Sequence, residues 1–200
     1  MRYSTIIIIA ALLLTGGYTY AQNAQLISDK EKAMILQMRE EEKMARDVYL
    51  SLNEKWDHHV FTNISGSESH HMSLVKLLMD KFNLPDPVTK NNDKRGLFDN
   101  GSLQRMYNEL TASGMESTEA AFRAGAKVEE TDINDLVNAI AETSNADIKS
   151  TYQYLLQASY NHLRAFVRNL KKLGFIYQPI LLSTEDYDKI LDDDKGHGRH

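Results

Sequence analysis

Residues 61–82, FTNISGSESHHMSLVKLLMDKF, decide the fold predicted for this chain. Steps of three and four residues connect apolar side chains at both ends of the stretch with a carboxylate and an imidazole between them: Phe61, Ile64, Glu68, His71, Val75, Leu78 and Phe82. Apolar residues at this spacing mark the buried side of a helix. A carboxylate buried without a partner is strongly unfavourable. The stretch therefore predicts a buried helix face on which Glu68 and His71 require a partner.

Three other segments repeat the apolar spacing of a helix: residues 28–53, 117–141 and 145–173. The first begins at Ser28, a good N-cap residue, and the last is followed by Gly174, a typical residue after a helix end. The chain has only three prolines and no sustained alternation of apolar and polar residues. We therefore expect an all-α protein in which these segments and the opening stretch form four long helices.

The lengths of the connections predict how the four helices are arranged. The first two helices are joined tightly, and so are the last two, so each pair is expected to be an antiparallel hairpin. Residues 84–116 lie between the pairs and include a short amphipathic helix from Ser102 to Gly114. One long crossover between two hairpins is the ferritin-like topology. We expect this bundle, with a further short helix at STEDYDKIL, to form one domain over residues 28–192, followed by a polar tail at 193–200.

Polar residues occur near the middle of all four apolar stripes: Glu42; Glu68 and His71; Glu129; and His162. Four antiparallel helices would bring them to about one level. Ferritin-like di-metal proteins carry a Glu on two helices and Glu-x-x-His on the other two. We therefore predict one or two iron or manganese ions, bound by oxygen and nitrogen ligands. Glu68 would bridge, Glu42 and Glu129 would be terminal ligands, and each histidine would bind one ion.

The fourth helix departs from this pattern because Ser159 stands where Glu-x-x-His would place the glutamate. Asp132, one turn beyond Glu129, is a candidate replacement ligand or a hydrogen-bond partner for a ligating histidine. Glu130 is a further candidate, although its flank is only partly apolar. The sequence leaves open whether one ion binds or two bind unequally.

Each of these residues also has a simpler interpretation. Glu42 belongs to the charged run REEEKMARD at 39–47, in which we expect Glu40 and Glu41 to be solvated. The apolar neighbours of Glu42 at helical spacing favour burial instead. His162 could be a hydrogen-bonded core histidine. Tyr49 is expected to pack in the core, where a tyrosine beside a redox metal can also relay electrons.

Several motifs resemble known families. EKMARDVY at 42–49 is similar to the first-helix Glu-x-x-Ala-Arg-x-x-Tyr motif of rubrerythrins, and SESHHM at 67–72 to their second-helix Glu-x-x-His. Over residues 30–180 the chain resembles a ferritin-like family known as domain-of-unknown-function family 2202, through EEEKMARDVY, FTNISGSESHHM, GLFDNGSLQRMYNEL, VEETDINDL and SYNHLRAF. This resemblance implies a ferritin-like fold and a di-metal site, but no reaction.

Three functions remain open. The first is a di-metal oxidoreductase that oxidises Fe(II) with oxygen or reduces peroxide. The second is a non-catalytic module that stores, carries or is structured by a metal, and the third is a metal-free bundle that binds a partner. The chain has no cysteine, which excludes thiolate metal ligands and the cysteine-bound iron that rubrerythrins use for electron transfer. Oligomerisation is also possible.

The first residues predict export. Arg2 precedes an unbroken apolar run from Ile6 to Leu14, and Ala21 suits a signal-peptidase cleavage site. The run is too short to cross a bilayer, which takes about 20 residues. We expect residues 1–21 to be a signal peptide and the mature protein to be secreted or periplasmic, without a membrane contact. The formal net charge of −5 gives no electrostatic reason to expect a nucleic-acid partner.

Overall fold

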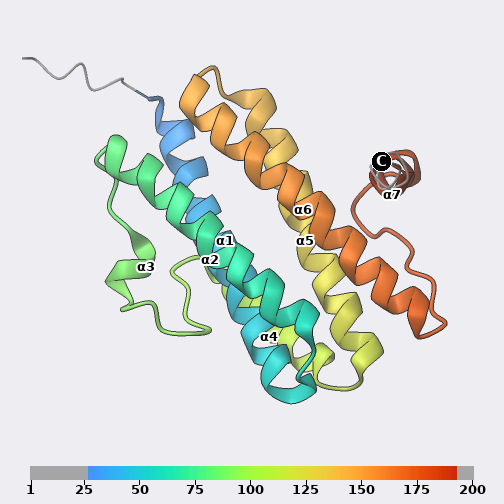
Figure 1. Ribbon diagram of the computed structural model, residues 1–200. Helices are drawn as coiled ribbons and strands as arrows, with labels where there is room; N and C mark the ends of the chain where they lie inside the picture. Colours follow the sequence, from blue (N-terminus) through green and yellow to red (C-terminus); the bar gives the residue numbers. More distant parts are fainter. Residues whose placement is uncertain (1–26, 193–200) are drawn as a thin grey trace, which may run out of the picture.

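The computed structural model describes residues 27–192, and every regular element within them is an α-helix (Figure 1). The predicted signal peptide and polar tail lie outside the described residues. The helices are α1 (Asp29–Trp56), α2 (His59–Lys81), α3 (Pro87–Lys90), α4 (Gly101–Gly114), α5 (Thr118–Glu142), α6 (Ala146–Lys172) and α7 (Thr184–Asp192). No helix within residues 27–192 combines the length and apolarity that a membrane span requires. The predicted all-α fold class is confirmed.

The long helices begin where side chains satisfy free backbone N–H groups. Ser28 and Glu31 form a capping box at the start of α1, in which Glu31 N donates to Ser28 Oγ at 3.2 Å and Ser28 N donates to Glu31 Oε2 at 2.8 Å. Asn145 Oδ1 accepts from the N–H of Asp147 at 3.0 Å at the start of α6. The Ser28 and Asn145 caps occur where the sequence predicts helix starts.

The four long helices pack as two pairs. Helix α1 lies against α2 and α5 lies against α6, while α1 also contacts α5 and α2 contacts α6 (Figure 1). The connection from α2 to α5 contains α3 and α4. Helix α3 packs on α1, and α4 packs on both α1 and α5. It returns the chain to the end of the bundle where α5 begins (Figure 1). The helices therefore form a bundle whose interior is lined by all four long elements.

A buried ion pair on α1 binds the backbone of the connection between α2 and α5. Lys43 Nζ donates to Asp47 Oδ2 at 2.5 Å and to the carbonyl oxygen of Lys94 at 2.9 Å. Asp47 Oδ2 also accepts from the N–H of Gly96 at 2.9 Å. The side chains of Lys43 and Asp47 are only 1% and 0% exposed. These contacts join α1 directly to the backbone of the crossover.

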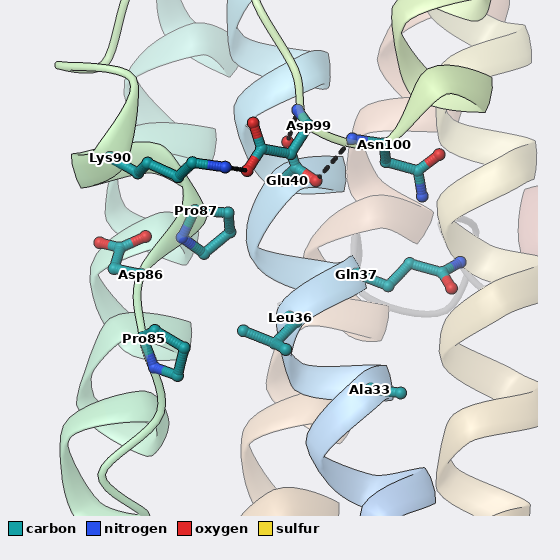
Figure 2. Close-up of a pocket in the computed structure, with 10 residues that line it drawn as sticks. All are labelled: Ala33, Leu36, Gln37, Glu40, Pro85, Asp86, Pro87, Lys90, Asp99 and Asn100. Atoms are coloured by element: carbon teal, nitrogen blue, oxygen red, sulfur yellow. Dashed lines mark hydrogen bonds and ion pairs between the residues drawn. The ribbon is translucent and has the colours of Figure 1, made fainter.

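Glu40 and Glu41 correct an expectation from the charged run, because both are buried rather than solvated. Glu40 accepts hydrogen bonds from the backbone N–H groups of Asp99 and Asn100, at 2.6 and 3.1 Å (Figure 2). Gln37 Nε2 donates to Glu41 at 2.9 Å. Glu40 also borders a groove of about 720 Å³ between α1 and the crossover, which none of the predicted metal ligands lines (Figure 2).

Gly125 allows α5 and α6 to approach closely. A Cβ at this position would lie 2.5 Å from Cε1 of Phe166, whose ring packs against Tyr49 at a centroid distance of 5.3 Å. We expect Gly125→Ala to lower the free energy of unfolding by about 1–3 kcal/mol, because the buried ring has no free space to occupy. Chemical denaturation measures this change.

Gly66 provides the matched control, since it lies within α2 and a Cβ there meets no atom within 4 Å. Gly66→Ala should raise stability by about 0.5–1 kcal/mol through better helix propensity. Equal effects of the two substitutions would contradict the close approach at Gly125.

Candidate metal centre

The five principal residues predicted as ligands meet in the interior of the bundle. Glu42 comes from α1, Glu68 and His71 from α2, Glu129 from α5 and His162 from α6. They are 1%, 2%, 1%, 1% and 8% exposed, in that order. Each lies on the apolar stripe of its helix, so the packing that buries the stripe also brings the polar side chains together.

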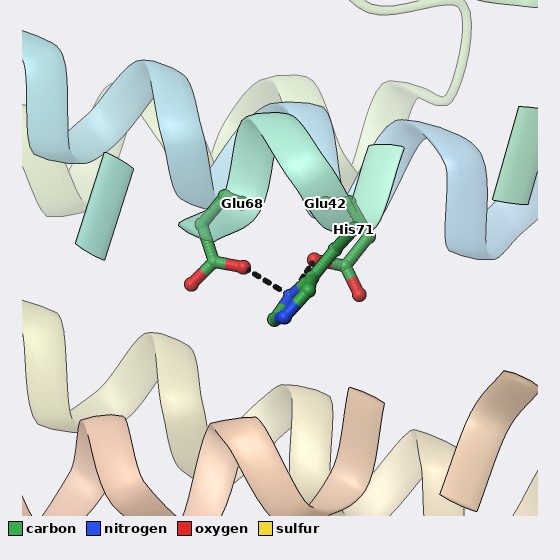
Figure 3. A group of neighbouring side chains, drawn as sticks. All are labelled: Glu42, Glu68 and His71. Carbon is green, nitrogen blue, oxygen red and sulfur yellow. Dashed lines mark hydrogen bonds and ion pairs between the residues drawn. The ribbon is translucent and has the colours of Figure 1, made fainter. Parts of the chain in front are cut away.

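The first half of the cluster is built around His71. Its Nδ1 lies 2.7 Å from Glu68 Oε2 and 3.2 Å from Glu42 Oε2 (Figure 3). The other oxygen of Glu42, Oε1, is buried and has no hydrogen-bond partner. One ligand atom from each of these three residues fits within 4.8 Å of the others, which is close enough for one metal ion.

The second half is built around His162, whose Nδ1 lies 2.9 Å from Glu68 Oε1 and 3.5 Å from Glu129 Oε2. Although these distances are short, the nitrogen makes no aligned hydrogen bond. Glu68, Glu129 and His162 form a second group whose ligand atoms lie within 4.8 Å of one another. Glu68 therefore belongs to both groups, with each oxygen facing a different imidazole.

Ser67 contacts both histidines from the opposite side. Its Oγ lies 3.3 Å from Nε2 of His71 and 3.1 Å from Nε2 of His162, and the two rings stack at a centroid distance of 5.7 Å. Both rings consequently present Nδ1 to the carboxylates. The sequence analysis missed Ser67, although its position four residues before His71 places the two on one helix face.

Protons balance the charges of the cluster when no cation is present. Burial alone would lower the pKa of His71, but hydrogen bonds that the imidazole donates to Glu42 and Glu68 raise it to about 11. Burial alone would also lower the pKa of His162, but Glu68 and Glu129 raise it to about 10. Burial raises the pKa of Glu42 to about 8. Burial alone would raise the pKa of Glu68, but the two imidazoles hold it below the usual range.

Tyr49 fixes the position of Glu129. The tyrosine is fully buried, and its hydroxyl donates a hydrogen bond to Glu129 Oε1. Burial raises the pKa of Glu129, and it raises the pKa of Tyr49 well above the usual value with help from the negative charge of Glu129. Tyr49 therefore has a polar role in addition to the packing that its sequence position predicts.

Asp132 lies beside the cluster, facing the position that lacks a glutamate. Its Oδ2 accepts a hydrogen bond from Ser159 Oγ at 2.5 Å, while its Oδ1 is buried and unpaired. Burial raises the pKa of Asp132 well above the usual value, and the charges of Glu42 and Glu129 add to this shift. The carboxylate thus bonds to Ser159 rather than to an imidazole.

Glu130 is fully engaged elsewhere. Its carboxylate accepts from the hydroxyl of Tyr177 at 2.6 Å, and its Oε2 accepts from the backbone N–H groups of Ile180, Leu181 and Leu182 at 2.9, 2.7 and 2.9 Å. The side chain holds the segment that leads from α6 to α7. Glu130 therefore does not join the groups around Glu68.

We expect Glu130→Ala to lower the free energy of unfolding by about 1.5–3 kcal/mol, because hydrogen bonds to a charged acceptor are lost and buried Tyr177 is left unpaired. Hydrogen exchange of the amides at 180–182 should accelerate at the same time.

The matched control is Glu119→Ala on the same helix. Its partly exposed ion pair with Arg123 should contribute at most about 1 kcal/mol. Unchanged hydrogen exchange at 180–182 in Glu130→Ala would show that the hydrogen bonds of Glu130 do not hold this segment.

Comparisons with known proteins find similarity in both sequence and fold. Residues 31–194 match the family described as "Uncharacterized protein domain (DUF2202)". The chain is 46% identical over 167 residues to "Uncharacterized protein MJ0754" of Methanocaldococcus jannaschii, covering 84% of this chain and 89% of that protein. The crystal structure of hypothetical protein MJ0754 from Methanococcus jannaschii matches with a TM-score of 0.82 and covers 84% of this chain and 95% of that one. This chain therefore belongs to the DUF2202 family.

Proposed function

We propose that this protein is a ferritin-like four-helix bundle whose interior binds one or two iron or manganese ions. The ligands would be Glu42, Glu68, His71, Glu129 and His162. The observation that carries the proposal is the position of Glu68, which offers one carboxylate oxygen to each imidazole at 2.7 and 2.9 Å. The pairing of α1 with α2 and of α5 with α6, joined by a long crossover, supports the ferritin-like assignment.

The residues present fit a cation. Glu42 Oε1 and His162 Nδ1 are buried polar atoms without a hydrogen-bond partner, which is the state expected of ligand atoms. Carboxylate oxygen combined with imidazole nitrogen suits iron and manganese. Two divalent ions would also neutralise the three carboxylates. Glu68 would bridge, with Glu42 and His71 on one side and Glu129 and His162 on the other.

The proposed activity is oxidation of Fe(II) by oxygen or reduction of peroxide. A bound iron or manganese centre supplies the electron transfer for such chemistry. The chain itself holds the carboxylates in a buried interior, and Tyr49 orients Glu129 through its hydroxyl. Without cysteine, the protein has no thiolate-bound iron of its own, so electrons for a peroxide cycle would come from a separate donor.

A second candidate is a non-catalytic module that binds a single ion. Ser159 favours it, because it supplies no carboxylate where a fourth-helix glutamate would stand. Anaerobic titration of untagged protein with Fe(II), followed by exposure to oxygen, separates the candidates. Two bound equivalents with an oxygen-dependent absorbance change support the redox function. One redox-silent equivalent supports the binding module. No bound metal contradicts both and leaves a metal-free bundle that binds a partner.

Metal binding should release about two to three protons per protein at pH 7, because cations displace protons from imidazoles whose pKa values are about 11 and 10 and from Glu42, whose pKa is about 8. These groups are protonated below their pKa values, so metal affinity should rise with pH from 6 to 8. Calorimetry in buffers of different ionisation enthalpy counts the protons. Buffer titrated without protein is the control, and affinity independent of pH would contradict protonated histidines in the metal-free centre.

A further inference from the structure

Four buried oxygen atoms near the centre have no hydrogen-bond partner: Glu41 Oε2, Glu42 Oε1, Asp132 Oδ1 and Tyr152 OH. Glu41 is 5% exposed and Tyr152 is fully buried. Buried polar atoms are normally paired, and unpaired ones indicate a bound water or ion. The three helices α1, α5 and α6 each contribute to this set.

These oxygens lie in one region beside the centre. Burial and the charges of Glu42 and Glu129 raise the pKa of Asp132. Burial, Asp135 and the charge of Asp132 in turn raise the pKa of Glu41. Tyr152 lies within electrostatic range of both Glu41 and Glu42. On α5, Glu129, Asp132 and Asp135 follow one another at three-residue intervals, so they lie along one side of the helix.

A small surface cavity of about 160 Å³ meets the outer end of this line of oxygens. Glu41 and Asp135 both line it, and their carboxyl groups are within hydrogen-bonding reach of each other. Glu142 lines it too, and no lysine or arginine is among its lining residues. Glu142 is paired with Lys30 at 2.9 Å, so Glu41 and Asp135 supply the unneutralised acidic groups of the cavity, and Glu41 Oε2 is buried without an aligned hydrogen bond.

The centre needs a route for ions, since its proposed ligands are at most 8% exposed. We propose that Glu41 and Asp135 form a second, weaker binding site for divalent cations, from which ions pass by Asp132 to the buried centre. This inference rests on the proposed metal-binding function. It assigns to the cavity a cation rather than an organic ligand, because its charged side chains are acidic and its volume is small.

The first experiment follows the rate of Co(II) loading into metal-free protein by stopped-flow absorbance. Glu41→Gln and Asp135→Asn should each slow loading about tenfold, because the local concentration of cations at the entrance falls. The equivalents of tightly bound metal that remain after dialysis should not change. Glu109→Gln, an exposed change on α4, is the matched control and should load at the wild-type rate.

The outcomes separate this inference from the function on which it rests. Normal loading rates in both variants would overturn the entry route while leaving the centre intact. Fewer equivalents of tightly bound metal after dialysis would also overturn it, because Glu41 and Asp135 would then belong to the centre or to its folding. Failure of the wild-type protein to bind any metal would contradict the proposed function itself.

The second experiment detects the weaker site directly. In Glu68→Ala protein, whose proposed bridging ligand is absent, electron paramagnetic resonance of free Mn(II) should still reveal one weakly bound ion. Adding Glu41→Gln should remove it. Absence of weak binding in Glu68→Ala protein that is folded by circular dichroism would overturn the second site. If that variant does not fold, the loading rates decide the question.

Discussion

Glu68→Ala should abolish metal binding at both positions of the proposed centre. Glu68 is the carboxylate that contacts both imidazoles, and it is only 2% exposed. Changing residues that merely support metal ligands typically weakens affinity by about 10- to 100-fold. Loss of a bridging ligand should exceed this range, because the two histidines would have no shared anion. Metal analysis after dialysis measures the effect.

Three variants make this prediction specific. Glu42→Ala and Glu129→Ala each remove a residue from only one of the two groups, so each should preferentially weaken one ion. Glu109→Ala, on the exposed side of α4, should retain the full wild-type content. Retention of wild-type metal content by Glu68→Ala would show that the bridging role is wrong.

Asp47→Ala should lower the free energy of unfolding by about 3–5 kcal/mol, the typical result of breaking a buried ion pair from one side. The side chain of Lys43, 1% exposed, would lose its carboxylate partner. The N–H of Gly96 would lose its acceptor as well. Since these contacts join α1 to the crossover, the loss should appear in urea denaturation as a lower midpoint with little change in slope.

The chain supplies a matched control for this substitution. Lys76 and Asp80 form an ion pair with the same four-residue spacing, but their side chains are 36% and 59% exposed. Asp80→Ala should therefore cost at most about 1 kcal/mol. Replacing Lys43 and Asp47 together by Met and Leu should recover much of the loss, because no unpaired charge remains. A small effect of Asp47→Ala alone would contradict the importance of the buried pair.

The sequence was sufficient to predict the four long helices and the meeting of the candidate ligands. Helical periodicity is a local property, and it places Glu42 or His162 on the same face as the apolar residues that must be buried. Once the long helices pack by these faces, side chains near their middles converge. The separations between atoms, such as those from Glu68 to the two imidazoles, depend on packing and could not be predicted from spacing.

The failures have a common physical cause, which is that the partner is distant in the sequence. Glu40 and Glu41 occur in a run of charges and were expected to be solvated, yet the crossover covers Glu40 with backbone N–H groups at 99 and 100. Glu130 is held by a segment about fifty residues further along the chain. A periodicity argument contains no information about such partners. Ser67 differs, because its relation to His71 is local and could have been recognised.

The contact of Ser67 with both imidazoles means that the two halves of the centre cannot be adjusted independently. A hydroxyl oxygen has two lone pairs, so Ser67 can accept an N–H from each ring at 3.3 and 3.1 Å and hold both rings with Nδ1 toward the carboxylates. Any displacement of this oxygen alters the basicity of both nitrogens on the carboxylate side. One small side chain thereby links the two imidazoles, while different carboxylates, Glu42 on one side and Glu129 on the other, distinguish the halves.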